Sequence, residues 1–211
     1  ALANNSVCYT EKPDVETFLR EWTSLVESKS GERGVFNRVA SKKQAEKYGR
    51  RDSNWDFGTN PCSEIILRPY QFCNLTEVVV RATDSLEDLE RKVRLATILG
   101  TIQSTYTYFP YLRRVWQRNT EEERLLGVSL TGIMDNPLMT SKNEGLGKTL
   151  EHLRLVAVDT NAEWALRLGI PASASITCVK PSGTVSQLVD SASGIHTRHS
   201  PYYIRTVRGD S

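Results

Sequence analysis

Apolar positions along the chain recur every three or four residues in several stretches, a spacing that predicts amphipathic helices. Asp14 is expected to cap the first of them, which runs to about Ser28. Further helices are expected from Ser85 through at least Leu99 and, after Pro110, over residues 111–118. Two more are expected over residues 38–48 and 148–168.

Between these helices lie short runs rich in β-branched and apolar residues, which predict strands over 74–80, 125–130 and 176–179. Residues 1–9 are also expected to be strand-like. Strands that alternate with long helices are typical of an α/β architecture with parallel pairing. No internal repeat or low-complexity tract interrupts the pattern.

Composition describes an ordinary soluble globular protein, with 39% hydrophobic and 25% charged residues. A net charge of +2 gives no concentrated basic face, so neither nucleic-acid nor membrane-surface binding is expected. No apolar run reaches the roughly 20 residues that span a bilayer. The chain shows no secretion leader, and its four cysteines are too scattered for a disulfide framework, which favours a reducing cytoplasm.

A loop before the first main strand carries the residues best suited to chemistry. Residues 58–61 are turn formers that lead directly into Cys62. If the backbone is extended there, Asn60, Cys62 and Glu64 project to one side, because side chains alternate along an extended chain. An amide, a thiol and a carboxylate facing one volume suit catalysis, although a free cysteine is often only a buried structural residue. Cys62 and Cys73 are too far apart for a C-x2-C metal knuckle, so no metal site is predicted.

Three segments resemble one enzyme family. Residues 60–75, NPCSEIILRPYQFCNL, resemble the active-site loop of ribonucleotide reductases, most closely the adenosylcobalamin-dependent class II enzymes. Residues 180–187, continuing to 193–196, look like the family's substrate-phosphate loop and the turn after it. Residues 126–135 are similar to a family core strand and turn. The segments occur in the family's order and span most of the chain.

This resemblance implies a ten-stranded α/β barrel built from two half-barrels, with the Cys62 loop as a finger in its centre. The chain would supply only some of those strands, so residues 1–211 are expected to form a partial catalytic barrel domain. Family members are much longer and the chain does not begin with methionine. It is therefore expected to be an internal piece of a larger reductase, or one part of a split one.

The resemblance also implies a role for each residue of the loop. Cys62 matches the thiyl radical that removes the 3′ hydrogen of the ribose. Glu64 matches the base that takes the 3′-hydroxyl proton, and a carboxylate two residues from the thiol can reach that oxygen. Asn60 matches the amide that orients the sugar. Cys73 matches one half of the redox pair that is oxidised to a disulfide.

The other thiols are expected to be structural. The family's redox partner of Cys73 lies upstream of any aligned segment, and the surroundings of Cys8 do not match it. Cys178 lies in an apolar run. Free cysteines of this kind are usually buried.

The source of the radical distinguishes the classes of the family. Glu64 argues against class III, and the interval of eleven positions from Cys62 to Cys73 is similar to class II, which implies adenosylcobalamin as cofactor. The implied substrates are ribonucleoside di- or triphosphates, and the implied partners are a dithiol reductant such as thioredoxin or glutaredoxin and the remainder of the reductase chain. Two alternatives stay open: a class I large-subunit fragment that receives its radical from a partner subunit, and a non-catalytic nucleotide-binding half of a split enzyme.

The second matching segment supplies the expected phosphate site, formed by Pro181, Ser182, Gly183, Thr184 and Ser186. Hydroxyls and backbone N–H groups at a helix start suit a phosphate, because that end carries donors and partial positive charge. The alternative is an ordinary capped helix start.

Two further groups carry weaker signals. The basic run at residues 196–205 could help to balance nucleotide charge, but an exposed loop explains it more simply. The tyrosines are expected to be core and interface aromatics rather than a radical relay; they lie at positions 106, 108, 111, 202 and 203.

Overall fold

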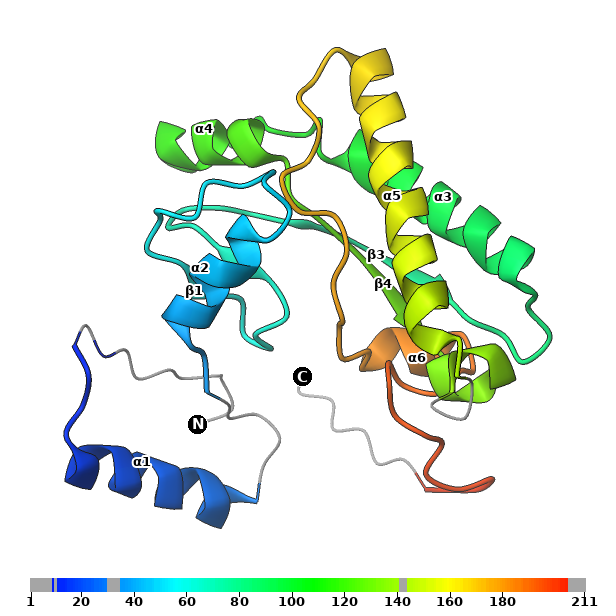
Figure 1. The fold of residues 1–211 in the computed structure, drawn as a ribbon, viewed down its shortest axis with the longest axis horizontal. Helices are drawn as coiled ribbons and strands as arrows, with labels where there is room; N and C mark the ends of the chain where they lie inside the picture. Colours follow the sequence, from blue (N-terminus) through cyan, green and yellow to red (C-terminus); the bar gives the residue numbers. More distant parts are fainter. Residues whose placement is uncertain (1–8, 10, 30–34, 141–143, 205–211) are drawn as a thin grey trace, which may run out of the picture.

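The computed structural model describes residues 9, 11–29, 35–140 and 144–204 of the chain (Figure 1). Helices and short strands are mixed along its length. Their order is α1 (Val15–Ser28), α2 (Arg38–Glu46), β1 (Gly58–Thr59), β2 (Ile66–Leu67), β3 (Asn74–Val79), α3 (Leu86–Gln103), α4 (Arg114–Glu123), β4 (Leu126–Thr131), α5 (Leu146–Leu168) and α6 (Thr184–Leu188). Two 3-10 turns, η1 (Ile133–Asp135) and η2 (Pro137–Met139), precede α5.

The centre of the fold is a parallel pair of strands, β3 and β4, in register from Asn74 beside Leu126 to Val79 beside Thr131. This pairing confirms the two longer predicted strands and their parallel orientation. A parallel pair needs a crossover connection, and α3 and α4 supply it.

A third extended segment runs parallel to β4 on its other side. Val128 receives a bond from Cys178 N–H at 3.0 Å and donates its own N–H to Ile176 O at 2.8 Å. Pairing is limited to an isolated bridge between Val128 and Thr177, so the expected strand over 176–179 is only partly formed. Among the described residues no strand covers the other edge of this segment, which leaves it paired on one side alone.

Helices α3 and α5 pack against each other, and α3 also covers β3 and β4 (Figure 1). Leu89, Val93 and Ala96 of the predicted α3 stripe are buried, whereas Leu99 is 64% exposed. The start of α3 is fixed by a capping box between Ser85 and Asp88. The core that results lies between this helix pair and the sheet; it contains Val78, Val80, Leu89, Val93, Ala96, Leu126, Val128, Met139, Leu153, Ala157 and Ile176.

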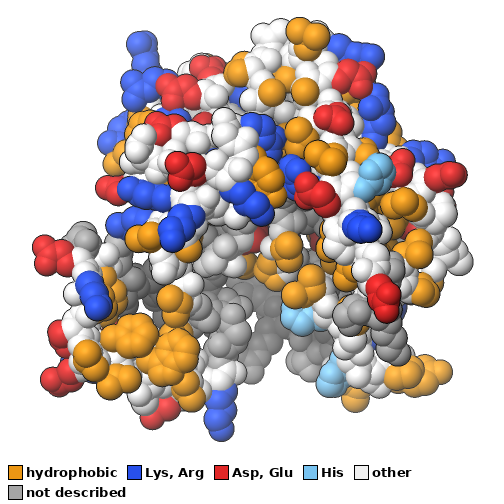
Figure 2. Space-filling model, in the orientation of Figure 1, with side chains coloured by type: hydrophobic (Ala, Val, Ile, Leu, Met, Phe, Trp, Pro, Cys, Tyr) orange, Lys and Arg blue, Asp and Glu red, His pale blue; other side chains and the backbone are white. Residues whose placement is uncertain are grey.

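Helix α1 has the predicted bounds and the predicted cap, because Asp14 Oδ1 accepts a hydrogen bond from Thr17 N–H at 2.8 Å. Its apolar face is not part of the core. Phe18 and Trp22 stack on one another and are each about half exposed, and no residue of the helix is buried. Apolar side chains accordingly gather over α1 in Figure 2.

The bounds of helix α4 differ from the predicted range of 111–118. The helix begins at Arg114 and continues to Glu123. Tyr111 lies in the preceding turn and is 97% exposed. The end of the helix buries polar residues, Asn119, Thr120 and Glu123, which a search for apolar spacing does not detect. The five tyrosines expected in the core or at interfaces are all more than half exposed, so a core role is wrong for them.

The described residues thus form a mixed helix and strand fold in which α3 packs on the parallel β3–β4 pair and α5 packs on α3. The ten-stranded barrel and the finger loop remain predictions. No helix among them is both long and apolar enough to cross a membrane. The strand expected over residues 1–9 lies almost wholly outside the described residues.

Candidate active site

The Cys62 motif forms the tip of a small antiparallel hairpin. Strands β1 and β2 pair Gly58 with Leu67 and Thr59 with Ile66. Between them the chain turns: Ser63 N–H donates to Asn60 O at 3.0 Å, and Ser63 has a left-handed φ of 63°. Cys62 is exposed at this tip. The hairpin therefore presents the thiol to solvent.

The expected alternation of side chains is wrong, because residues 60–64 are turned rather than extended. Asn60 uses its side chain to close the turn, with Oδ1 accepting from Ile65 N–H at 3.0 Å. Pro61 fixes one backbone dihedral, and asparagine readily makes such local bonds, so this sequence favours a turn. Asn60, Cys62 and Glu64 still lie in one loop, but the turn brings them together rather than the alternation of side chains along a strand.

Glu64 has a buried and unpartnered oxygen. Its Oε2 is shielded from solvent and makes no hydrogen bond to any part of the chain that the structure describes. A buried polar atom is usually satisfied, so such an exception suggests a missing partner. An unpartnered carboxyl oxygen of this kind can form a hydrogen bond with a bound molecule.

Two thiols lie on the sheet near this carboxylate. Burial raises the pKa of Cys73, and the negative charge of Glu64 raises it further, whereas Lys180 lowers it. Burial likewise raises the pKa of Cys178 to about 12, with Glu64 and Cys73 adding to the effect. Both thiols therefore stay protonated at neutral pH. That Cys178 is structural stays a prediction. Its segment pairs with β4, and its thiol lies close enough to Glu64 to be affected by that charge. Cys8 lies outside the described residues.

The expected phosphate loop is held largely by its own hydroxyls. Ser182 and Ser186 are buried, and Ser182 Oγ accepts from Ser186 N–H at 3.2 Å while Ser186 Oγ donates to Gly183 O at 2.8 Å. Pro181, Gly183 and Thr184 are exposed. Gly183 occupies the N-cap of α6 and has no side chain to cap it. Of the first three N–H groups of the helix, that of Ser186 is bonded to Ser182 Oγ, whereas those of Thr184 and Val185 receive no side-chain cap.

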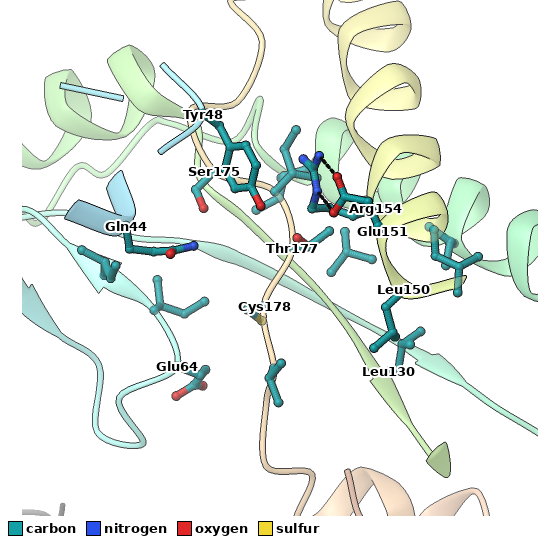
Figure 3. A pocket seen from close by; sticks show the side chains of 18 of the residues that line it. Gln44, Tyr48, Glu64, Leu130, Leu150, Glu151, Arg154, Ser175, Thr177 and Cys178 are labelled. Carbon is teal, nitrogen blue, oxygen red and sulfur yellow. Dashed lines mark hydrogen bonds and ion pairs between the residues drawn. The ribbon is translucent and has the colours of Figure 1, made fainter. Parts of the chain in front are cut away.

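A cavity of about 710 Å³ lies between α2, the 174–179 segment and α5 (Figure 3). Glu64 and Cys178 line it, together with Tyr48, Arg154 and many apolar residues. Its lining does not include Asn60, Cys62, Cys73 or residues 181–186. The predicted site residues therefore fall into two groups, with only Glu64 of the predicted set facing this cavity.

One member of the basic run at residues 196–205 is neutralised by carboxylates, and Arg205 lies outside the described residues. Arg198 binds Asp135 at 3.0 Å and Asp190 at 2.8 Å. Arg198 thus connects two other parts of the chain through ion pairs. This agrees with the interpretation of the run as an exposed loop rather than as a binding site for nucleotide charge. Among the described residues no three His, Cys, Asp or Glu side chains are grouped to hold a metal ion.

Comparison with known proteins gives a consistent result, although no family model matches the chain. It is 35% identical over 158 residues to a probable adenosylcobalamin-dependent ribonucleoside-triphosphate reductase of Dictyostelium discoideum, covering 72% of this chain and 19% of the relative. It is 29% identical over 211 residues to the adenosylcobalamin-dependent ribonucleoside-triphosphate reductase of Lactobacillus gasseri, covering 85% of this chain and 27% of the relative. The enzyme of the same name from Lacticaseibacillus paracasei is 27% identical, with 98% and 30% covered.

A solved structure agrees with these relatives. The crystal structure of a B12-dependent class II ribonucleotide reductase matches with a TM-score of 0.55 and 27% identity, over 66% of this chain and 22% of that one. The chain spans less than a third of the length of each of these relatives. The relatives are cobalamin enzymes, so they do not favour the class I alternative or the non-catalytic one.

Proposed function

The chain belongs to the adenosylcobalamin-dependent, class II ribonucleotide reductases, and from this premise we propose that it forms part of the catalytic domain of such an enzyme. The reaction proposed is reduction of a ribonucleotide to its 2′-deoxy form for DNA precursor synthesis. The observation that carries the proposal is the hairpin tip, where an exposed thiol lies two residues from a carboxylate with an unpartnered oxygen.

In this proposal Cys62, as a thiyl radical, takes the 3′ hydrogen atom of the ribose and becomes a thiol. Glu64 accepts the 3′-hydroxyl proton, which drives loss of the 2′ oxygen as water. Two thiols, Cys73 and a partner, supply two electrons and two protons and form a disulfide. One proton goes to the 2′ hydroxyl as it leaves as water, and one hydrogen atom goes to carbon 2′. The remaining electron, with the proton that Glu64 returns, restores the 3′ hydroxyl and leaves a radical on carbon 3′. The hydrogen on Cys62 returns to carbon 3′, and the thiyl radical is restored.

The second redox thiol is proposed to lie outside the described residues. The sheet register places Cys178 and Cys73 about four residues apart along their strands, on opposite sides of β4. At about 3.3 Å per residue this offset alone is about 13 Å. A disulfide needs Cα atoms within about 7 Å, so Cys178 does not pair with Cys73 in this fold.

The cofactor proposed is adenosylcobalamin, the group for which the matched reductases are named. When bound, it supplies an organic radical that withdraws a hydrogen atom. An exposed thiol at a hairpin tip is a suitable donor for that atom, because its sulfur is accessible from outside the sheet. Cys62 is the residue of this chain that would face the cofactor.

The substrate proposed is a ribonucleoside triphosphate, since the matched relatives are named triphosphate reductases. Thr184 and the N–H groups at the start of α6 would contact the phosphates, with Pro181 and Gly183 shaping the loop and Ser182 and Ser186 holding it from within. Comparing turnover of a ribonucleoside triphosphate with that of its diphosphate distinguishes the two substrate classes.

Two variants test the proposal in the complete reductase chain, supplied with adenosylcobalamin and a dithiol. Cys62→Ser removes the hydrogen-atom donor, and Glu64→Gln removes the proton acceptor. Both are expected to abolish detectable deoxynucleotide formation, while Cys178→Ser is expected to retain it. Undiminished product from the Cys62→Ser enzyme would refute the assignment.

A further inference from the structure

Behind the hairpin lies a network of charged and amide side chains that is almost completely enclosed. Each of its five members is no more than 9% exposed; they are Arg51, Arg68, Gln71, Asn119 and Glu123. Arg51 precedes the hairpin, Arg68 and Gln71 lie between Cys62 and Cys73, and the other two belong to α4. The network therefore joins the segment with both proposed site thiols to a helix more than forty positions away.

Glu123 is the centre of this network. Its Oε2 accepts from Arg51 Nη2 at 2.8 Å and from Gln71 Nε2 at 2.5 Å, and its Oε1 lies 3.2 Å from Arg51 Nε. Arg51 also donates from Nη1 to the main-chain oxygen of Ile66 in β2 at 2.8 Å. One carboxylate thus fixes an arginine that itself holds a strand of the hairpin.

Arg68 and Asn119 hold the segment between Cys62 and Cys73 against α4 through hydrogen bonds. Arg68 Nη2 donates to Asn119 Oδ1 at 2.9 Å and to Glu122 Oε2 at 2.8 Å, and Arg68 Nη1 lies 3.7 Å from Glu123. Asn119 Nδ2 donates to the main-chain oxygen of Pro69 at 2.9 Å. The backbone between Cys62 and Cys73 is therefore bonded directly to α4.

The main chain of Glu123 extends these links to a third segment. Its carbonyl oxygen accepts from Ala174 N–H at 2.8 Å, and Ala174 begins the stretch that carries Cys178 and leads to the 181–186 loop. Side chain and backbone of Glu123 therefore contact the stretch before the hairpin, the stretch between the two thiols, and the start of the segment that carries Cys178.

Stability alone is a poor explanation for such a network. Burying ions incurs a large desolvation cost, and apolar side chains of similar volume often stabilise a fold equally well. Charge-assisted bonds differ from apolar packing in fixing distance and direction. A network of this kind is suited to holding two thiols in a defined arrangement.

We propose that Glu123 is a positioning residue, which through Arg51, Arg68 and Gln71 sets the Cys62 hairpin relative to Cys73 for the radical chemistry. The role rests on the function proposed above. It acts through the scaffold, since Glu123 itself does not line the cavity. Misplacement of reacting groups by about 1 Å can reduce a rate by about 100-fold, so a change at this remote residue has a large expected effect.

The test compares Glu123→Gln with Glu163→Gln in the complete reductase chain. Glu163 is a matched control, because it also binds two arginines, Arg94 at 2.8 Å and Arg167 at 2.7 Å, but on an exposed helix face. Thermal unfolding first sets a temperature at which both variants are fully folded. Steady-state kinetics and the alkylation rates of Cys62 and Cys73 with N-ethylmaleimide are then measured there.

For folded Glu123→Gln we expect kcat to fall about tenfold or more, with KM changed by less than about twofold, and Cys73 to be alkylated faster. Glu163→Gln should match the parent in each respect. A folded Glu123→Gln enzyme with parental kcat and parental alkylation rates would overturn the proposal. If Glu123→Gln does not fold, Glu123→Asp, which keeps the charge and shortens its reach, is judged by the same criteria.

The alkylation measurement separates this inference from the proposed reaction. If Cys62→Ser keeps its activity, the proposed function fails, and unchanged labelling in Glu123→Gln would then refute positioning as well. Faster labelling of Cys73 in that case would leave Glu123 as the residue that fixes the two thiols.

Discussion

Glu123 and Arg51 form a two-point ion pair across 72 positions of sequence, with their side chains only 8% and 4% exposed. Removing one partner of such a pair leaves the other charge buried without compensation. Glu123→Gln is therefore expected to lower the free energy of unfolding by about 3–5 kcal/mol. Urea unfolding measures this change.

The exposed pairs of Glu163 provide the comparison. Glu163→Gln should change the free energy of unfolding by no more than about 1 kcal/mol, because surface ion pairs contribute little. Equal destabilisation by the two variants would contradict the burial argument.

Gly127 allows a test of the close packing between β3, β4 and the Cys178 segment. A Cβ at this position would lie 2.4 Å from Leu75 Cδ2 and 3.2 Å from both Cys178 Sγ and Ile65 Cδ1. Gly127→Ala is expected to destabilise the fold by about 1–3 kcal/mol through overpacking. Gly147→Ala is the control, since open space surrounds that helical glycine and alanine favours a helix by up to about 1 kcal/mol. Stabilisation by both changes would show that the sheet can relax.

The thiols should differ sharply in reactivity. With its pKa at about 12 against an ordinary 9.0, Cys178 at pH 9 has a thiolate fraction about 500-fold lower than an unperturbed thiol. Iodoacetamide should therefore label exposed Cys62 first, Cys73 more slowly and Cys178 last, as mass spectrometry of the peptides would show. Labelling of Cys178 as fast as Cys62 would contradict the burial of its sulfur.

The same shift makes stability depend on pH. The unfolded thiol of Cys178 ionises near 9.0, whereas the folded thiol keeps its proton to about 12. Ionisation then favours the unfolded state, so stability present below pH 9 should decline as pH rises from 9 toward 12. Cys178→Ser should reduce that decline, which unfolding midpoints at several pH values would measure.

Asn60 has two separable tasks. Its Oδ1 closes the turn at Ile65 N–H, and its amide nitrogen is proposed to bind the ribose. Asn60→Ala should destabilise the hairpin by about 1 kcal/mol, whereas Asn60→Asp keeps an acceptor and should recover most of that loss. Turnover should fall in both variants, because both lack the amide donor. Full activity in Asn60→Asp would limit the residue to the turn.

Sequence patterns foresaw the elements that depend on local chemistry. Asp14 caps α1 and Ser85 begins α3 as expected, and the apolar runs of β3 and β4 pair in parallel. These features arise from neighbours in sequence or from a strong apolar run, which a single sequence displays directly.

The network around Glu123 could not be foreseen in the same way. Arg51 and Arg68 lie in loops, where charged residues usually face water, and their acidic partners follow 72 and 54 positions later. Such groups are buried only because they pair with residues far away in the sequence, and no periodic pattern in the sequence reveals those pairs. The motif around Cys62 was informative about its residues but not about its shape. Gly58 and Thr59 are extended in β1, but Asn60 and Pro61 start a turn where an extended backbone was assumed.

Ser63 lies between the proposed thiol and carboxylate in a left-handed conformation, with φ at 63°. For residues other than glycine this geometry costs about 1–2 kcal/mol. Glycine at this position would adopt the same φ without that cost, but it would also make the backbone between the Cys62 thiol and the Glu64 carboxyl group more flexible. Serine instead restricts the backbone between the Cys62 sulfur and the Glu64 carboxyl group, so the folded hairpin itself sets their separation.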